Sequence, residues 1–339
     1  QDALPNETKQ SMENIGISEI DINNFQDITP EKIFGEIFKI AKKNSPAVMR
    51  SIAIVLAIIL LSALINSIKL SVKDRPLSGI IEIISTLCIC FAVIHPIVNS
   101  INKTGSIIKG ASRFLLCYIP VITGIMVASG NAVNASSYSM MMFSAGEIMS
   151  LISSEILVPL LNVFLALCIV SSISPNLNFS GICDMFAKTI KWILGFVMTI
   201  FVGLLTIQSL VGEAIDNVGT KTLKFMAGSF VPIVGSALGD ALSTVHSCVK
   251  VLKSGVGAFS IIAAGFIFIP IIIDCLLWLL SVNICASFGD IFSLSNTSSL
   301  LRNSGKVIST MLAIVICAMI VLIISTVIVC DVEFLRSRT

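Results

Sequence analysis

The sequence predicts an all-α polytopic membrane protein with six to seven transmembrane helices, an internal duplication and two re-entrant-like hairpins broken by proline and glycine. Composition is the first observation behind this prediction. Hydrophobic residues make up 55% of the 339 residues, charged residues only 12%, and the mean hydropathy is +0.98. A soluble domain of this length could not bury so much apolar surface, so its solvent must be largely lipid. Long uncharged runs and a repeated proline–glycine segment are the other two observations.

The repeated segment is P-V-I-T-G at residues 120–124, which returns as P-I-V-G at residues 232–235, so Pro232 follows Pro120 by 112 positions. A second proline pair, Pro159 and Pro270, is separated by 111 positions. Similar residues precede the two copies at nearly the same offset: Lys109, Arg113 and Phe114 before the first, and Lys221, Lys224 and Phe225 before the second. Duplicated apolar segments with such interruptions are typical of transport-type membrane proteins.

Residues 1–45 differ from the rest of the chain because they are polar and at first acidic. An amphipathic helix is predicted to begin at Thr29-Pro30-Glu31. It would lie on the bilayer surface as part of an extramembrane segment, or dock a partner protein. The chain begins at Gln1 without an initiator Met, which leads us to expect an upstream segment lost by cleavage of a signal peptide or by trimming.

Uncharged runs divide the remainder into four parts. Residues 46–76 hold the first transmembrane helix and a basic turn, 77–190 form membrane repeat unit 1, 191–290 form repeat unit 2, and 291–339 hold a loop, the last transmembrane helix and a short charged tail. The uncharged runs are 51–68, 83–100, 114–146, 156–173, 192–212, 225–239 and 307–330, and the run 254–289 carries a single charge.

Two of these runs, 114–146 and 225–239, are the broken segments. If they are re-entrant, each unit crosses the membrane twice and the repeats are parallel. If they cross, each unit has three crossings and the repeats are inverted. The distribution of lysine and arginine does not settle the orientation of the chain.

Sequence signatures of enzymes and metal centres are absent. The chain has no G-x-x-x-x-G-K-[ST], G-x-S-x-G or H-E-x-x-H pattern, no C-x-x-C, and only two histidines, 151 positions apart. Its net charge of +2 is too small to indicate nucleic acid as a partner. We therefore expect no enzymatic activity, no catalytic or metal site and no cofactor, and an ATP-driven process would need its ATPase on another chain.

The candidate pore or gate residues are those that break the apolar runs or carry charge within or beside them: Pro120, Gly124, Pro232, Gly235, Gly239, Asp240 and Asp274. Proline and glycine leave backbone groups unpaired, which is tolerated at membrane depth only inside protein or beside water. Asp274 is the one charge in the run 254–289. It either lines a pore or substrate path or pairs across the bundle as a structural group.

Charged residues bracket the second broken segment and are the candidate interface residues: Asp216, Lys221, Lys224, Lys250 and Lys253. They would contact another subunit. The alternative is that the lysines anchor the segment by extending to the membrane surface.

Four segments of this region carry a family resemblance: T-I-F-V-G-L-L-T-I-Q-S-L (199–210), D-N-V-G-T-K-T-L-K-F (216–225), S-F-V-P-I-V-G-S-A-L-G-D-A (229–241) and L-K-S-G-V-G (252–257). With Y-I-P-V-I-T-G in unit 1, they resemble the stage III sporulation protein AE family, over nearly the whole chain after about residue 45. The charged tail D-V-E-F-L-R-S-R-T after Cys330 departs from the family pattern, in which the chain ends soon after the last span.

This resemblance implies a multi-pass protein of the mother-cell membrane surrounding the engulfed forespore. It also implies a place in a channel or secretion-like complex with a secretion-type ATPase and ring-forming proteins. The family's usual signal peptide would account for the missing Met. The family has no catalytic residue to carry over.

We therefore expect a scaffold or export-gate subunit of the sporulation channel, in contact with the bilayer and with the other subunits, and able to form a homo-oligomer. The alternative is a secondary transporter related to autoinducer-exporter-like permeases, whose P-x-x-G segments resemble residues 229–239, with Asp274 as its coupling group. An intramembrane enzyme ranks third because no constellation of reactive residues supports it.

Overall fold

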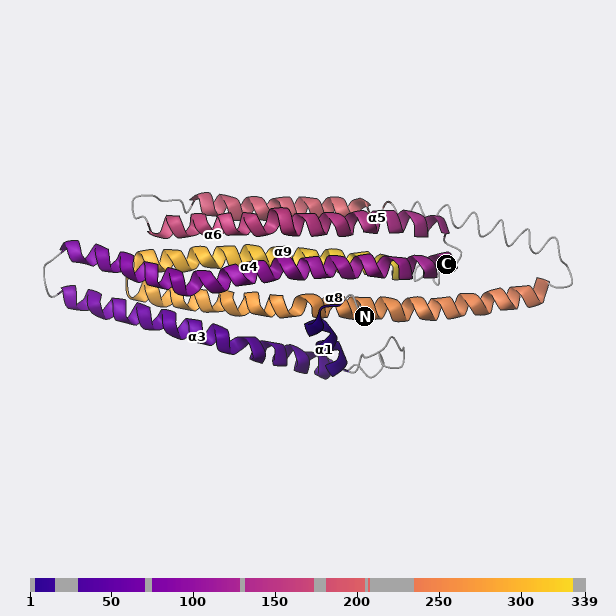
Figure 1. Cartoon of the computed structure of the whole chain (residues 1–339), viewed down its shortest axis with the longest axis horizontal. Coiled ribbons are helices and arrows are strands. Elements are labelled where there is room, and N and C mark those ends of the chain that lie inside the picture. The colour runs from indigo at the N-terminus through magenta and orange to yellow at the C-terminus, as the bar shows by residue number, and fades with distance from the viewer. Residues whose placement is uncertain are drawn as a thin grey trace.

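The fold is a bundle of long helices that lie roughly along one axis (Figure 1). A computed structural model describes residues 4–15, 30–70, 75–128, 132–173, 181–204, 207 and 235–331, and within these ranges all regular structure is helical. The elements are α1 (Asn6–Asn14), α3 (Pro30–Leu70), α4 (Arg75–Ala128), α5 (Ala132–Leu151), the π-helix η1 (Ile152–Leu157), α6 (Val158–Ile173), the helix Gly181–Leu204, α8 (Gly235–Ile291) and α9 (Ser295–Asp331).

Six helical stretches in the described part of the chain are long and apolar enough to cross a membrane: Glu31–Ile65, Ile83–Ala128, Ala135–Ser172, Gly181–Leu204, Val256–Ile291 and Ser295–Thr326. The prediction of an all-helical polytopic membrane protein is confirmed at this level. Large apolar side chains such as Phe91 and Met140 are more than three quarters exposed. In a membrane protein such side chains face lipid or another subunit.

The core lies where α4, α8 and α9 pack together. Fully buried residues follow one face of α4 at spacings of three, four or seven, including Ile97, Ile101, Ile108 and Leu115. The fully buried residues of α8 include Phe268 and the small Ala263 and Ala264, and small side chains allow close approach of neighbouring helices. In Figure 1, α3 covers one side of this central layer, and α5 and α6 cover the other.

The helices are longer than the uncharged runs predicted. Helix α4 has 54 residues and α8 has 57, which at 1.5 Å per residue gives lengths of about 80 and 85 Å, well beyond the roughly 30 Å of bilayer hydrocarbon. Pro96 and Pro120 lie inside α4, and Pro270 lies inside α8, without ending either helix. Neighbouring helices can satisfy the backbone groups that proline leaves unpaired.

The first broken segment, 114–146, contains the end of α4 and most of α5. These two helices pack along one another, and the Ser112 hydroxyl of α4 donates a hydrogen bond to the Gly146 carbonyl of α5. Most of the second broken segment, 225–239, lies outside the described residues, and its last part forms the start of α8. The internal duplication and the re-entrant hairpins stay predictions.

The N-terminal region contains α1, a short helix that precedes the predicted amphipathic helix, and the position of the latter on the bilayer surface stays a prediction. Helix α1 packs against α8, with Met12 buried and the Thr8 hydroxyl 3.5 Å from the Phe266 carbonyl oxygen. The amphipathic stretch that begins at Pro30 is the first part of α3 and continues into the first span without a break. Asn14 donates a hydrogen bond of 2.9 Å to the buried carboxylate of Glu36, which ties α1 to α3.

Candidate functional site

Asp274 is half-buried on α8, and its carboxylate faces α4. The Ser100 hydroxyl of α4 donates a hydrogen bond of 2.9 Å to the Asp274 carboxylate. Lys103 follows Ser100 by three positions on α4, so the two residues share a helix face, and Lys103 is also half-buried. A carboxylate in an apolar span needs such polar partners. The hydrogen bond to Ser100 fits a structural role for Asp274, in which the carboxylate pairs across the bundle. The partial exposure of Asp274 fits the other role, in which it lines a pore or substrate path.

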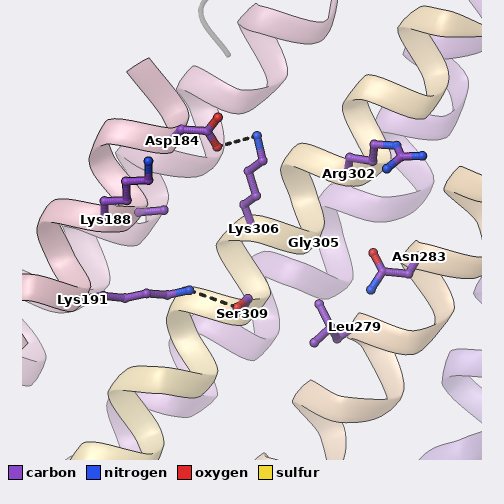
Figure 2. A pocket seen from close by; sticks show the side chains of 10 residues that line it. Asp184, Lys188, Lys191, Leu279, Asn283, Arg302, Gly305, Lys306 and Ser309 are labelled. Carbon is purple, nitrogen blue, oxygen red and sulfur yellow. Dashed lines mark hydrogen bonds and ion pairs between the residues drawn. The ribbon is translucent and has the colours of Figure 1, made fainter. Parts of the chain in front are cut away.

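A second polar site lies between the helix Gly181–Leu204, α8 and α9. It is a groove of about 460 Å³, lined by Asp184, Ala187, Lys188, Lys191, Leu279, Asn283, Arg302, Gly305, Lys306 and Ser309. Figure 2 shows these side chains projecting from the three helices. Four of the lining side chains are cationic and one is a carboxylate, so the groove has an excess of positive charge.

Helical spacing places the charged residues of each helix on one face. Asp184, Lys188 and Lys191 are separated by four and three positions, and Arg302 and Lys306 by four. The two faces meet through an ion pair of 2.7 Å between Lys306 Nζ and Asp184 Oδ1. The two contacts drawn in Figure 2 join the helix Gly181–Leu204, called the peripheral helix from here on, to α9.

The second of these contacts runs from Lys191 Nζ to the Ser309 hydroxyl over 3.3 Å. Gly305 of α9 lies beside Asn283 of α8, since a Cβ at this position would be 3.5 Å from Asn283 Oδ1, an ordinary contact distance. The groove floor is therefore formed by the α8–α9 pair, and the peripheral helix supplies its outer wall.

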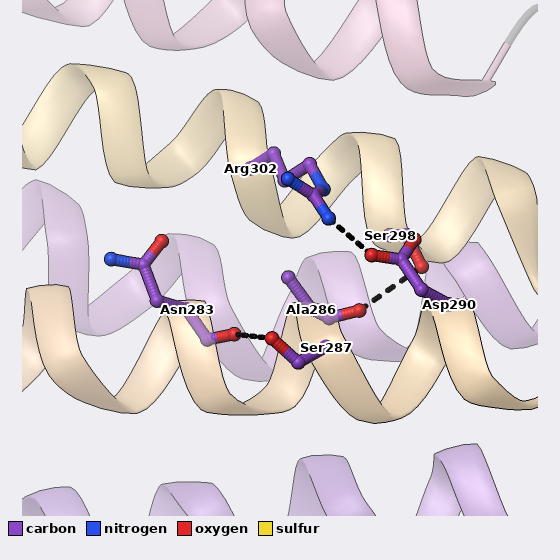
Figure 3. Close-up of polar contacts among 6 residues, drawn as sticks. All are labelled: Asn283, Ala286, Ser287, Asp290, Ser298 and Arg302. Atoms are coloured by element: carbon purple, nitrogen blue, oxygen red, sulfur yellow. Dashed lines mark hydrogen bonds and ion pairs between the residues drawn. The ribbon is translucent and has the colours of Figure 1, made fainter.

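The turn between α8 and α9 is held by polar contacts, which Figure 3 shows. Arg302 forms an ion pair with Asp290, and the Ser298 hydroxyl donates a hydrogen bond of 3.2 Å to the Ala286 carbonyl. Gly289 faces this serine so closely that a Cβ would lie 2.5 Å from Ser298 Oγ. Ser293 adopts a φ of 57°, the left-handed region used by residues that end a helix.

A buried amide anchors α6 to the same part of α9. Asn303 Nδ2 donates a hydrogen bond of 3.1 Å to the Ser172 hydroxyl of α6, and both residues are buried. Buried polar groups with partners rigidify a membrane bundle, because their unpaired alternatives are costly in lipid. The polar residues of α9 between 297 and 309 thus connect it to several neighbouring helices.

The other predicted pore residues lie far from Asp274 or outside the described residues. Pro120 and Gly124 are exposed on α4, and Pro120 follows Ser100 by 20 positions, or about 30 Å of helix. Asp240 precedes Asp274 by 34 positions of one continuous helix, or about 50 Å. One chain therefore does not bring Asp240 and Asp274 into a single site.

The remaining predicted residues fall into two groups. Gly235, Gly239, Lys250 and Lys253 belong to the first part of α8, where the backbone is described and the side chains are not. Pro232, Asp216, Lys221 and Lys224 lie outside the described residues. The interface role of the charged residues among them stays a prediction.

Sequence reasoning missed the basic groove. Its signal was visible as D-x-x-x-K-x-x-K before Trp192 and R-x-x-x-K before the last apolar run. Each pattern alone is an ordinary charged flank of a transmembrane helix. In the part of the chain that the structure describes, no group of three or more His, Cys, Asp or Glu residues converges on a metal site.

Comparison with known proteins adds the family. The family model described as stage III sporulation protein AE matches residues 17–332. A curated relative, stage III sporulation protein AE of Bacillus subtilis (strain 168), is 22% identical over 244 residues, which cover 71% of this chain and 60% of the relative. This chain thus aligns with less than two thirds of that relative's length. No solved structure matches.

Proposed function

The chain belongs to the stage III sporulation protein AE family, and we propose that it is an integral-membrane subunit of the channel complex that links mother cell and forespore. The observation that carries the proposal is the family match from residue 17 to residue 332, which covers all six apolar helices. The protein acts as a scaffold or export gate in the mother-cell membrane and supports forespore development.

Its partners in this proposal are a secretion-type ATPase, ring-forming proteins and further copies of the chain. Two features of the surface support contacts beyond the single chain. Pro120 and Gly124 are exposed near the end of α4, and the helix Gly181–Leu204 has only 11% of its most apolar stretch buried. Apolar surface of this extent is covered by lipid or by another subunit.

A second candidate function is a secondary transporter, and the observation that favours it is Asp274. A half-buried carboxylate with a hydroxyl partner inside an apolar span is the kind of group that binds a proton or an ion during transport. Under this alternative, ionisation of the carboxylate is required. In a scaffold, the structure needs the hydrogen bond from Ser100 to Asp274 but not the charge of the carboxylate.

The substitution Asp274→Asn separates the two functions because the amide oxygen can still accept the Ser100 hydrogen bond while the charge is lost. It is introduced into the chromosomal copy of a spore-forming host, and forespore development and copurification of the ATPase are measured. The control is Asp290→Asn, which removes an exposed carboxylate from the C-terminal end of the same helix, together with its ion pair to Arg302.

A scaffold retains both assembly and forespore development in the Asp274→Asn variant. A transporter assembles normally but stops forespore development, and only the Asp274 variant has this defect. The second result would reject the scaffold and favour coupled transport.

A further inference from the structure

The groove between the helix Gly181–Leu204, α8 and α9 has no part in the function proposed above. We propose that it binds the phosphate headgroup of an anionic phospholipid. Three properties of the groove support the assignment. It has an excess of positive charge, it lies at the boundary between charged and uncharged residues on α9 and on the peripheral helix, and exposed apolar surface continues from it.

The two lysines of the groove that have no ion pair among the described residues both lie on the peripheral helix. Lys306 is paired with Asp184 inside the groove, and Arg302 is paired with Asp290 beside it. Among the described residues, no carboxylate lies within ion-pair distance of Lys188 or Lys191.

In the described part of the chain, Lys191 donates a hydrogen bond to the neutral hydroxyl of Ser309, and Lys188 is exposed. Two ammonium groups one helical turn apart, with no carboxylate partner among the described residues, are suited to binding a phosphate oxyanion. Figure 2 shows both lysines on the same helix beside the Asp184–Lys306 pair.

On α9 and on the peripheral helix, the groove lies where charged residues give way to an uncharged run, as at a membrane surface. On α9, the charged residues end at Lys306 and the uncharged run 307–330 follows. On the peripheral helix, they end at Lys191, and Trp192 follows directly.

The Trp192 side chain is 70% exposed and stacks on Phe196, with ring centroids 5.6 Å apart. Exposed tryptophans beside lysines mark the headgroup level of transmembrane helices. Basic pockets between such helices bind lipid headgroups.

The source of the phosphate is a lipid because apolar surface continues from the groove along the same helix. Ile193, Phe196 and Ile200 are about half exposed beyond Trp192. A lipid whose headgroup lies in the groove would place its acyl chains along this strip. A free phosphate anion would use the charges but leave the strip uncovered.

The test uses the full chain in a neutral detergent, with phosphatidylglycerol carrying brominated acyl chains as the probe and brominated phosphatidylcholine as the comparison. Bromine quenches a nearby tryptophan, so the lipid that binds the groove quenches Trp192. We expect saturable quenching by phosphatidylglycerol that exceeds quenching by phosphatidylcholine. The substitution Trp192→Phe should remove this excess, because the other tryptophan of the chain, Trp278, is buried on α8.

The double variant Lys188→Gln/Lys191→Gln should bind phosphatidylglycerol about tenfold more weakly or worse, since it loses charge-assisted hydrogen bonds. The single exposed variant Lys188→Gln should show an intermediate loss. The matched control Lys42→Gln/Lys109→Gln removes the same charge from exposed positions of α3 and α4 and should bind like the native chain.

Two results would overturn the proposal. One is equal preference for phosphatidylglycerol in the native chain and in the Lys188/Lys191 double variant. The other is that inorganic phosphate raises the unfolding temperature of the native chain while the brominated lipid leaves Trp192 unquenched, which would assign the groove to a free anion.

Discussion

Helix α8 and the helix Gly181–Leu204 can both cross a membrane, yet they are packed very differently. In the most apolar stretch of α8, 61% of the residues are buried, whereas the corresponding figure for Gly181–Leu204 is 11%. Lipid tails solvate apolar side chains as well as a protein core does. Apolar character therefore does not determine which helix is central and which is peripheral.

Most of the apolar stretch of α8 is packed inside the bundle, whereas the peripheral helix buries few residues, among them Cys183 and Ile190, and adds polar contacts to α9. Helix α8 buries Phe268, Ile271 and Cys275 completely among α4, α9 and α3. The peripheral helix is joined to α9 through Asp184 and Lys191. A peripheral helix with this kind of attachment is the part of the bundle best placed to contact lipid or a neighbouring subunit.

The largest expected difference between α8 and the peripheral helix is in the loss of stability when an aromatic ring is deleted from each. Phe268→Ala on α8 leaves a cavity in a fully buried site and should lower the free energy of unfolding by about 3 kcal/mol or more. Phe196→Ala on the peripheral helix removes a side chain that is 55% exposed and should cost less than about 1 kcal/mol. Reversible unfolding in mixed detergent micelles measures both. Equal losses would show that the peripheral helix is packed as firmly as α8.

Glycine-to-alanine substitutions on α8 and on the peripheral helix should differ in their effect on the free energy of unfolding, by a smaller amount. In Gly289→Ala, the new Cβ would meet Ser298 Oγ, and displacing that serine breaks its hydrogen bond to Ala286, so we expect a loss of about 1–3 kcal/mol.

At Gly195 of the peripheral helix, no atom lies within 4 Å of an added Cβ. Gly195→Ala should therefore stabilise the chain by about 0.5–1 kcal/mol through helix propensity. A loss at Gly195 as large as that at Gly289 would mean that another surface covers this position.

The smallest expected effect concerns the ion pair that joins the peripheral helix to α9. The side chains of Lys306 and Asp184 are 33% and 50% exposed, so solvent screens their attraction. A double-mutant cycle with Asp184→Asn and Lys306→Gln should give a coupling free energy of about 0.5–1 kcal/mol. A coupling of zero would leave Lys191 and apolar packing as the attachment of the peripheral helix.

The sequence was sufficient for the fold class and insufficient for the helix boundaries. Charged residues at 103, 109 and 113 separated two uncharged runs, whereas α4 continues through all three. Lys109 and Arg113 are exposed, so α4 can continue through these positions without burying their charges. An uncharged run marks the apolar part of a helix, and a helix can be much longer than its apolar part.

For the two polar sites, the sequence could predict which residues share one helix face but not their partners on other helices. Asp274 stands out because it is a carboxylate in an apolar run, but its partner Ser100 is 174 positions away. The basic groove depends on contacts such as that between Lys191 and Ser309, 118 positions apart. Helical periodicity orders residues on one helix face, and the pairing of faces depends on the packing of the whole bundle.

The most direct test of the account is purification of the tagged chain, after mild crosslinking, from membranes of sporulating cells, followed by identification of its partners and a density map. The account predicts an assembly that contains the secretion-type ATPase and ring-forming proteins, with the helix Gly181–Leu204 against lipid or a neighbouring subunit. A solitary chain that catalyses ion-coupled flux in vesicles, and loses it with Asp274→Asn, would contradict the account.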